Sequence, residues 1–135
     1  MQTPQKFLYE SIKKNFNRKA LWFENKFYTY EQIFNISKKI LFKLNYHNSK
    51  IIAVLDEKNI FCYCSILSIF LSSKIYVPLN EKFSDEKNIN IIKSANIDTI
   101  LVGKKLLKKI KNLKESLRKK VKIIVIDEKV LTEKE

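Results

Sequence analysis

Few residues of this chain could carry out metal or thiol chemistry. Cys62 and Cys64 are its two cysteines, and His47 is its one histidine. The cysteines lie two positions apart in a segment with helical periodicity, so their side chains point to different faces and cannot easily pair. With one histidine, a zinc site would lack ligands. We therefore expect no metal site, and we interpret both cysteines as small buried hydrophobic residues.

Positive charge is the other chemical feature of the sequence. Lysine and arginine number 27 against 14 acidic residues, a formal net charge of +13. A basic surface gains affinity for nucleic acid by releasing counterions. Only Arg18 and Arg118 are arginines, whereas bidentate binding of phosphates and bases favours arginine. Heavy use of Ile and Asn accompanies the lysines and indicates a compositional bias, so nucleic-acid binding is the less favoured hypothesis.

Length and apolar content define one folded domain. A chain of 135 residues leaves no room for a second domain to close over an active site, and its 45% hydrophobic residues suffice for a packed core. The N-terminus lacks the basic-then-apolar pattern of a signal peptide. No run reaches the roughly 18 apolar residues that a membrane span needs. We expect a cytoplasmic protein.

The first third of the sequence predicts a helix, a β-hairpin and a capped helix. Asn25 tolerates the positive φ of a tight turn between two aromatic runs. Thr29 followed by Gln32 is the capping-box arrangement, in which each side chain satisfies a free backbone amide. The predicted elements are a helix at residues 5–16, strands at 20–24 and 26–29, and a helix at 30–45.

From there, β-branched runs alternate with helical ones. Runs that are apolar without alternation are typical of parallel strands covered on both faces. Pro78 stands near the end of one such run, since proline cannot donate to a ladder, and Ser84 caps the helix that follows. The remaining expected elements are strands at 51–55, 75–79, 98–102 and 121–126, a helix buried all round at 59–72, a helix after Ser84, and a last helix at 104–119. This order predicts an α/β fold with a mostly parallel sheet.

The last predicted helix has one apolar and one basic face. The basic face carries Lys104, Lys105, Lys108, Lys111 and Lys114. The functional interpretation is a small basic module that binds nucleic acid or an anionic membrane through this helix. We favour a solvated face, because like charges one turn apart cost only tenths of a kcal/mol. Gly103 is the only glycine in the sequence. The two glycine-rich patterns that bind phosphates, G-x-G-x-x-G and G-x-x-x-x-G-K-[ST], are both absent.

Two segments resemble the amino-acid-activating adenylation domains of nonribosomal peptide synthetases, members of the adenylate-forming ligase superfamily. Phe27-Tyr-Thr-Tyr-Glu-Gln-Ile33 is similar to the opening family motif, an apolar run followed by Thr-Tyr-x-Glu-Leu. The segment from Ile69 to Asn80 resembles Leu-Lys-Ala-Gly-x-Ala-Tyr-Val-Pro-Leu-Asp, and Tyr76-Val-Pro-Leu79 matches it outright.

The same segments depart from the family pattern at four positions. Ser73 stands where the family has glycine, and Asn80 where it has aspartate. Ser84 and Lys87 stand where the family has proline and arginine. Both motifs build helix and sheet in the family and do not touch the reacting groups, so the resemblance assigns no catalytic, cofactor-binding or metal-binding residue to this chain.

The resemblance implies a single partial domain. Residues 5–126 correspond to the opening part of the family's large N-terminal subdomain, and 127–135 form a polar tail. The family's ATP, Mg²⁺ and ribose ligands would lie beyond Glu135. We therefore expect a scaffold that is inactive alone. It is either a relic of a longer synthetase gene or is completed by a second chain, such as the remainder of an adenylation domain or a synthetase chain. An uncovered sheet edge and apolar face also predict low stability or self-association.

Overall fold

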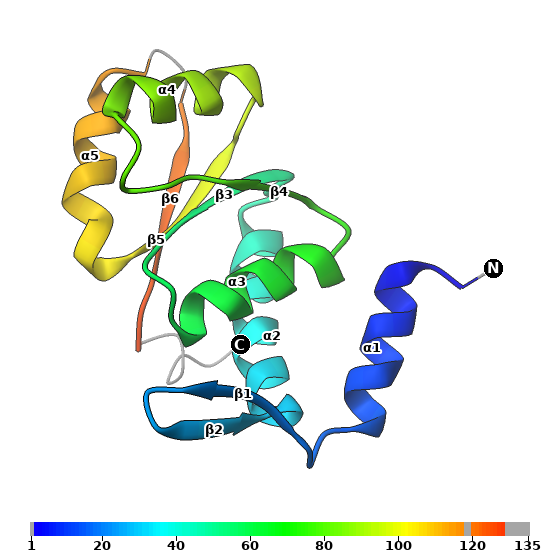
Figure 1. Cartoon of the computed structure of the whole chain (residues 1–135). Coiled ribbons are helices and arrows are strands. Elements are labelled where there is room, and N and C mark those ends of the chain that lie inside the picture. The colour runs from blue at the N-terminus through cyan, green and yellow to red at the C-terminus, as the bar shows by residue number, and fades with distance from the viewer. Residues whose placement is uncertain (1, 118–119, 129–135) are drawn as a thin grey trace.

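The computed structural model describes residues 2–117 and 120–128. Figure 1 shows the order of the elements along the chain. They are α1 (Pro4–Lys14), β1 (Lys19–Phe23), β2 (Lys26–Thr29), α2 (Tyr30–Tyr46), β3 (Ile51–Leu55), α3 (Ile60–Leu71), β4 (Ile75–Pro78), α4 (Asp85–Ser94), β5 (Thr99–Gly103), a 3-10 turn (Lys104–Leu106), α5 (Leu107–Glu115) and β6 (Lys122–Ile126). The positions agree with the expected elements to within one or two residues, except at the last helix.

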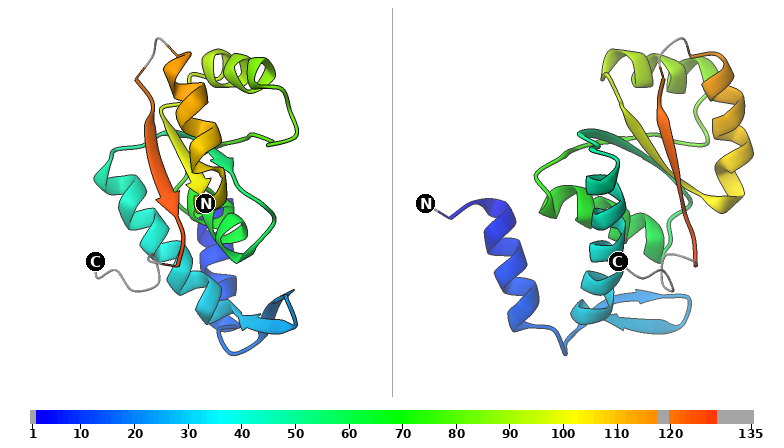
Figure 2. Two further views of the ribbon diagram at one scale, coloured as in Figure 1. Left: turned by 90° about the vertical axis from the view of Figure 1, so that its left-hand side faces the viewer. Right: turned by 180° about the vertical axis from the view of Figure 1, so that it is seen from behind.

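A four-stranded parallel sheet with the order β4-β3-β5-β6 forms the centre of the fold. Helices α2 and α3 cover one face and α4 and α5 cover the other, as the two views of Figure 2 show. Alternate residues of the central strand β3 enter the two cores, with Ile52 in the first and Ala53 in the second. The predicted α/β fold is confirmed. Burial on both sides explains why its strands are apolar without alternation.

The N-terminal elements follow the local signals in the sequence. Strands β1 and β2 pair antiparallel, and the turn between them places Glu24 and Asn25 at positive φ, 49° and 61°. The side chain of Thr29 accepts a hydrogen bond from the Gln32 amide at 3.2 Å, and the Gln32 side chain accepts one from the Thr29 amide at 2.8 Å. The predicted hairpin and capping box are therefore both present.

Asp98 anchors the amino end of the sheet. Its carboxylate accepts hydrogen bonds from the backbone amides of Lys50 at 3.0 Å and Ile51 at 2.8 Å, so it holds the start of β3 beside β5. The Thr99 hydroxyl lies 2.7 Å from this carboxylate and 2.6 Å from the buried Ser49 hydroxyl. Because a carboxylate only accepts, Thr99 donates to Asp98 and Ser49 donates to Thr99.

Two expectations about helices are wrong. α3 is not buried all round, because Tyr63 and Phe70 are exposed on its outer side. Its inner side holds the small buried residues Ser65 and Ser68, whose hydroxyls donate to carbonyls of the same helix. The last helix does not start as one α-helix at residue 104. A 3-10 turn carries the chain out of β5 first, and α5 begins at Leu107.

Some of the predicted elements extend beyond the residues that the structure describes. Residues 118–119 of the predicted last helix and 129–135 of the predicted tail are not among the described residues. None of the helices within 2–117 and 120–128 has the length and apolar character needed to cross a bilayer.

Candidate functional site

The position where open α/β sheets bind ligands lies between β3 and β5 in this fold. The chain passes from β3 through α3 to β4 on one side of β3, and then returns through α4 to β5 on the other side. Ligands of such sheets bind at the carboxyl ends of the strands where the direction of winding reverses. Asp56 follows β3 at this point, and Gly103 is the last residue of β5.

Asp56 and Gly103 are in direct contact. A β-carbon placed on Gly103 would overlap the Asp56 carboxylate, although the φ of Gly103 is an ordinary −69°. Space, and not backbone conformation, therefore requires glycine here. The Asp56 carboxylate also accepts a hydrogen bond from the Glu57 amide at 2.7 Å. Burial is the main cause that raises its pKa, and hydrogen bonds from Glu57 and Asn59 act in the opposite direction.

This arrangement is a poor site for a phosphate. Anion sites in such folds use free amides at a helix N-terminus, but Asn59 already accepts from the Cys62 amide at 2.9 Å in the first turn of α3. Asp56 also places a carboxylate beside this helix N-terminus, which disfavours an anion there. Lys105, whose charge acts on Asp56, forms an exposed ion pair with Glu57 at 3.5 Å. Asp56 and its partners stabilise the connection between β3 and α3, and we assign them no catalytic role.

The cysteines and the histidine do not come together. Cys64 is buried, and its thiol lies 3.7 Å from the Ile33 carbonyl. Burial raises the pKa of Cys64 to about 12. Cys62 is only half-buried, which corrects the expectation that both thiols are buried, and both are free. No group of three or more potential metal-ligating side chains occurs among the described residues.

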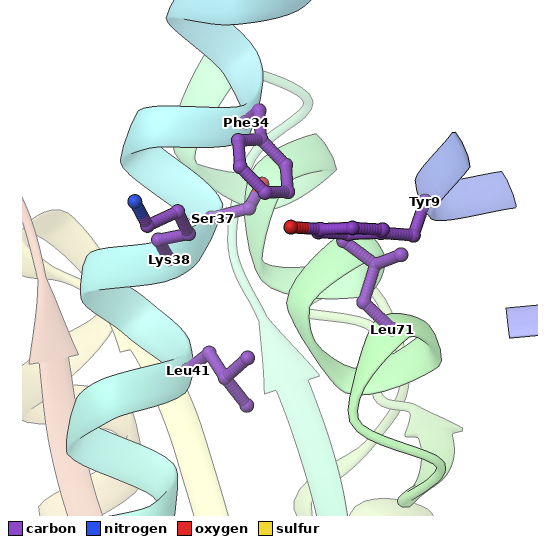
Figure 3. Close-up of a pocket in the computed structure, with 6 residues that line it drawn as sticks. All are labelled: Tyr9, Phe34, Ser37, Lys38, Leu41 and Leu71. Atoms are coloured by element: carbon purple, nitrogen blue, oxygen red, sulfur yellow. The ribbon is translucent and has the colours of Figure 1, made fainter. Parts of the chain in front are cut away.

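A pocket of about 320 Å³ lies between α1, α2 and α3. Figure 3 shows its lining residues, which are Tyr9, Phe34, Ser37, Lys38, Leu41 and Leu71. The rings of Tyr9 and Phe34 pack at 5.5 Å, and the Lys38 amine lies 5.5 Å from the Phe34 ring. The Ser37 hydroxyl is bound to the Ile33 carbonyl at 2.8 Å. The pocket is thus apolar with one cation at its side and has no pair of groups suited to acid–base catalysis.

An uncharged apolar face covers α3 and β4. Neither element contains a charged residue, although 30% of the chain is charged. The exposed large hydrophobic side chains on these two elements are Tyr63, Phe70, Ile75 and Tyr76. Ile75 is 57% exposed. Exposed apolar patches that lack charge are characteristic of protein–protein contact surfaces. Successive residues of a strand alternate, so Tyr76 lies on the α3 side of the sheet and Ile75 on the opposite side, and the surface wraps around the edge strand β4. We call these four residues the α3/β4 face.

The basic side of the last helix is exposed, as expected for a solvated face. Lys104, Lys105, Lys108, Lys111 and Lys114 all lie at the surface. The apolar side of the same helix is buried, with Leu106, Ile110 and Leu113 in the second core. Since its apolar side is already covered, this helix cannot insert into a membrane as an amphipathic helix does. Binding to a polyanion by charge alone stays an untested alternative.

Comparisons with solved structures agree on one fold. No protein-family model and no curated protein matches the sequence. Among solved structures, the Vibrio cholerae adenylation domain AlmE in complex with glycyl-adenosine-5'-phosphate matches with a TM-score of 0.81 and 21% identity. The match covers 93% of this chain and 24% of that chain. A red-emitting luciferase from Phrixothrix hirtus matches with a TM-score of 0.78 and 21% identity, over 89% of this chain and 30% of that one.

The match extends to other adenylate-forming enzymes. The anthranilate CoA ligase AuaEII in complex with anthranoyl-AMP has a TM-score of 0.79 and 18% identity, over 90% of this chain and 24% of that chain. The chain therefore has the fold of part of an adenylate-forming ligase. More particularly, its structural neighbours are adenylation domains of nonribosomal peptide synthetases and related AMP-binding ligases. This chain spans 24% to 30% of the length of the adenylation domain, the luciferase and the CoA ligase named above.

The residues that depart from the family motifs keep the local structure. Ser73 has a φ of 57°, a conformation that favours the family's glycine. Asn80 accepts a hydrogen bond from the Lys82 amide at 2.8 Å, as an aspartate could. Ser84 caps α4, and the Lys87 amine lies 3.8 Å from the Phe83 ring centre. Only Ser73 carries a conformational cost.

Proposed function

We propose that this chain supplies the N-terminal sheet scaffold of an enzyme that activates a carboxylic acid, such as an amino acid, as its adenylate. The observation that supports this most is the match to adenylation domains over 93% of the chain. The motif residues Thr29 and Gln32 form the expected cap, and Tyr76 and Pro78 lie in β4, as their resemblance to the family implies.

In this proposal the chain holds no reacting group. Its sheet fixes the positions of the loops around it, and ATP and Mg²⁺ would be held by other parts of the enzyme. Charge stabilisation at the departing pyrophosphate would come from those parts too. The two free cysteines fit a reducing, cytoplasmic setting.

The α3/β4 face is the surface on which we expect the rest of such an enzyme to pack. It joins an uncharged helix and strand in a chain of net charge +13. Partner atoms that cover Phe70 and Ile75 would remove apolar area from water, at about 25 cal/mol per Å².

ATP–pyrophosphate exchange with a panel of amino acids tests the proposal. We expect no exchange by the 135-residue chain alone. Exchange should appear when the chain is co-expressed with a polypeptide that supplies the remaining subdomains of the enzyme. Exchange by the purified chain alone would overturn the scaffold role, and so would a co-expressed pair that forms no complex and shows no exchange.

Two surface variants sharpen this test. Ile75→Glu places a charge on the α3/β4 face, and we expect it to abolish complementation without changing the melting temperature of the chain. Phe42→Glu is the matched control, since Phe42 is similarly exposed but lies on α2. Equal loss of exchange in both variants would mean that the α3/β4 face is not the contact surface.

A further inference from the structure

The two edges of the sheet differ in the backbone groups that they present. On β4, the Ile75 amide donates to the Lys50 carbonyl at 3.0 Å and the Leu79 amide donates to the Val54 carbonyl at 3.2 Å. Because alternate residues of a strand face its neighbour, Tyr76 and Pro78 face away from β3. Proline has no amide hydrogen, so this edge has one outward donor where two would be expected. Proline at such a position blocks the addition of another strand.

The β6 edge has no such block. The Lys122 amide donates to the Asp98 carbonyl at 3.0 Å, so the even-numbered residues of β6 face β5. Ile123 and Val125 therefore direct both their amides and their carbonyls outward. No hydrogen bond to these outward groups is found among the described residues. Strand β6 is also β-branched along most of its length, which favours pairing with another strand.

Charge changes sign along β6. Lys120 and Lys122 are exposed at its amino end, and Glu128 is exposed beyond its carboxyl end. At the positive end, the Lys122 amine lies 3.1 Å from His47 Nδ1. Burial first, and then Lys122 and Lys43, lower the pKa of His47. An antiparallel copy of the same strand would place a negative end beside this positive end, whereas a parallel copy would bring like charges together.

We propose that β6 pairs antiparallel with β6 of a second copy of this chain, joining the two four-stranded sheets into one continuous sheet. The two-fold axis passes near Ile124, so that Ile123 of each copy lies opposite Val125 of the other within the strand. Outward amides and carbonyls of Ile123 and Val125 then bond to the other strand. The positive amino end of each strand, with Lys122, lies diagonally across from the carboxyl end of the other, where Glu128 follows. Such a contact is isologous and closed, so it forms a dimer and not a filament. It goes beyond the proposed function and does not depend on it.

Sedimentation equilibrium of the full chain across a wide range of concentration tests the pairing. We expect a monomer–dimer equilibrium. Val125→Pro removes one outward donor from each copy and leaves the bonds to β5 in place, so it should weaken the dimer by about tenfold or more. The matched control is Tyr76→Pro, which removes the outward donor of β4 and should leave the dimer unchanged. Circular dichroism melts check that both variants fold.

Charge exchange gives a second measure that does not disturb the backbone. Lys122→Glu and Glu128→Lys should each weaken the dimer, since each brings like charges together at diagonal positions across the pair. The double variant, with both Lys122→Glu and Glu128→Lys, should restore the dimer, because opposite charges then meet again across the pair. A chain that stays monomeric at every concentration would overturn the proposal. So would a dimer that is insensitive to Val125→Pro, or a double variant no better than the single ones. None of these results bears on ATP–pyrophosphate exchange.

Discussion

The carboxylate of Asp56 lies in the space that a β-carbon on Gly103 would occupy. Asp56 directly follows β3, and Gly103 ends the neighbouring strand β5, at the switch point of the sheet. In this chain, glycine at that position makes room for a carboxylate of the protein itself and does not form part of a phosphate loop.

Gly103→Ala should lower the free energy of unfolding by about 1–3 kcal/mol, because the new methyl group forces the Asp56 carboxylate away from the Glu57 amide. Urea unfolding measures the change. In an Asp56→Ala background the same substitution should cost much less, since the space is then free. An equal cost in both backgrounds would show that the Asp56 contact is not the reason for glycine.

The stability of the chain should also depend on pH through Asp56. Burial raises the pKa of this carboxyl above its ordinary value of 3.8, so the folded state binds the proton more tightly than the unfolded state does. As the pH rises from about 4 through the raised pKa, the unfolded chain has lost this proton while the folded chain still holds it, and stability falls. Urea midpoints should show a shallower fall over this range in Asp56→Asn. An unchanged slope would contradict the prediction.

Ser73→Gly should stabilise the protein. Ser73 has a φ of 57° in the turn after α3, and a non-glycine residue in this left-handed region costs roughly 1–2 kcal/mol. Glycine also loses more backbone entropy on folding, so we expect a net gain of up to about 1 kcal/mol. The control is Ser72→Gly, at a φ of −91°, which should destabilise. Thermal melts of the two variants should therefore shift in opposite directions.

Lys122→Gln should raise the pKa of His47 towards its ordinary value of 6.5. Burial lowers this pKa most, and the neighbouring charge of Lys122 lowers it further. His47 is the only histidine, so its ring protons can be followed in a one-dimensional NMR titration. Lys104→Gln, on the distant basic face of the last helix, is the control and should leave the pKa unchanged. If Lys122→Gln has no effect, the 3.1 Å contact does not form in solution.

Structure that depends on neighbours in the sequence could be predicted from the sequence. The Thr29 and Gln32 cap joins residues three apart, and the Asn25 turn joins two adjacent strands. The alternation of apolar strands with helices predicted the parallel sheet in the same way. The apolar pattern of each strand depends on neighbouring residues and shows whether one or both of its faces are covered. The helix α3 was misjudged because its composition is apolar on all sides, and composition does not reveal which side receives a neighbour.

What the sequence by itself determined is the set of elements, their caps and the α/β class, because these follow from hydrogen bonds and burial patterns within short segments. Only the tertiary structure decided that Asp56 meets Gly103, 47 positions later in the chain. It alone established the strand order that makes β4 and β6 the edges. Contacts between distant residues depend on how the strands are ordered and aligned, and that order is set by packing of the whole sheet against its helices.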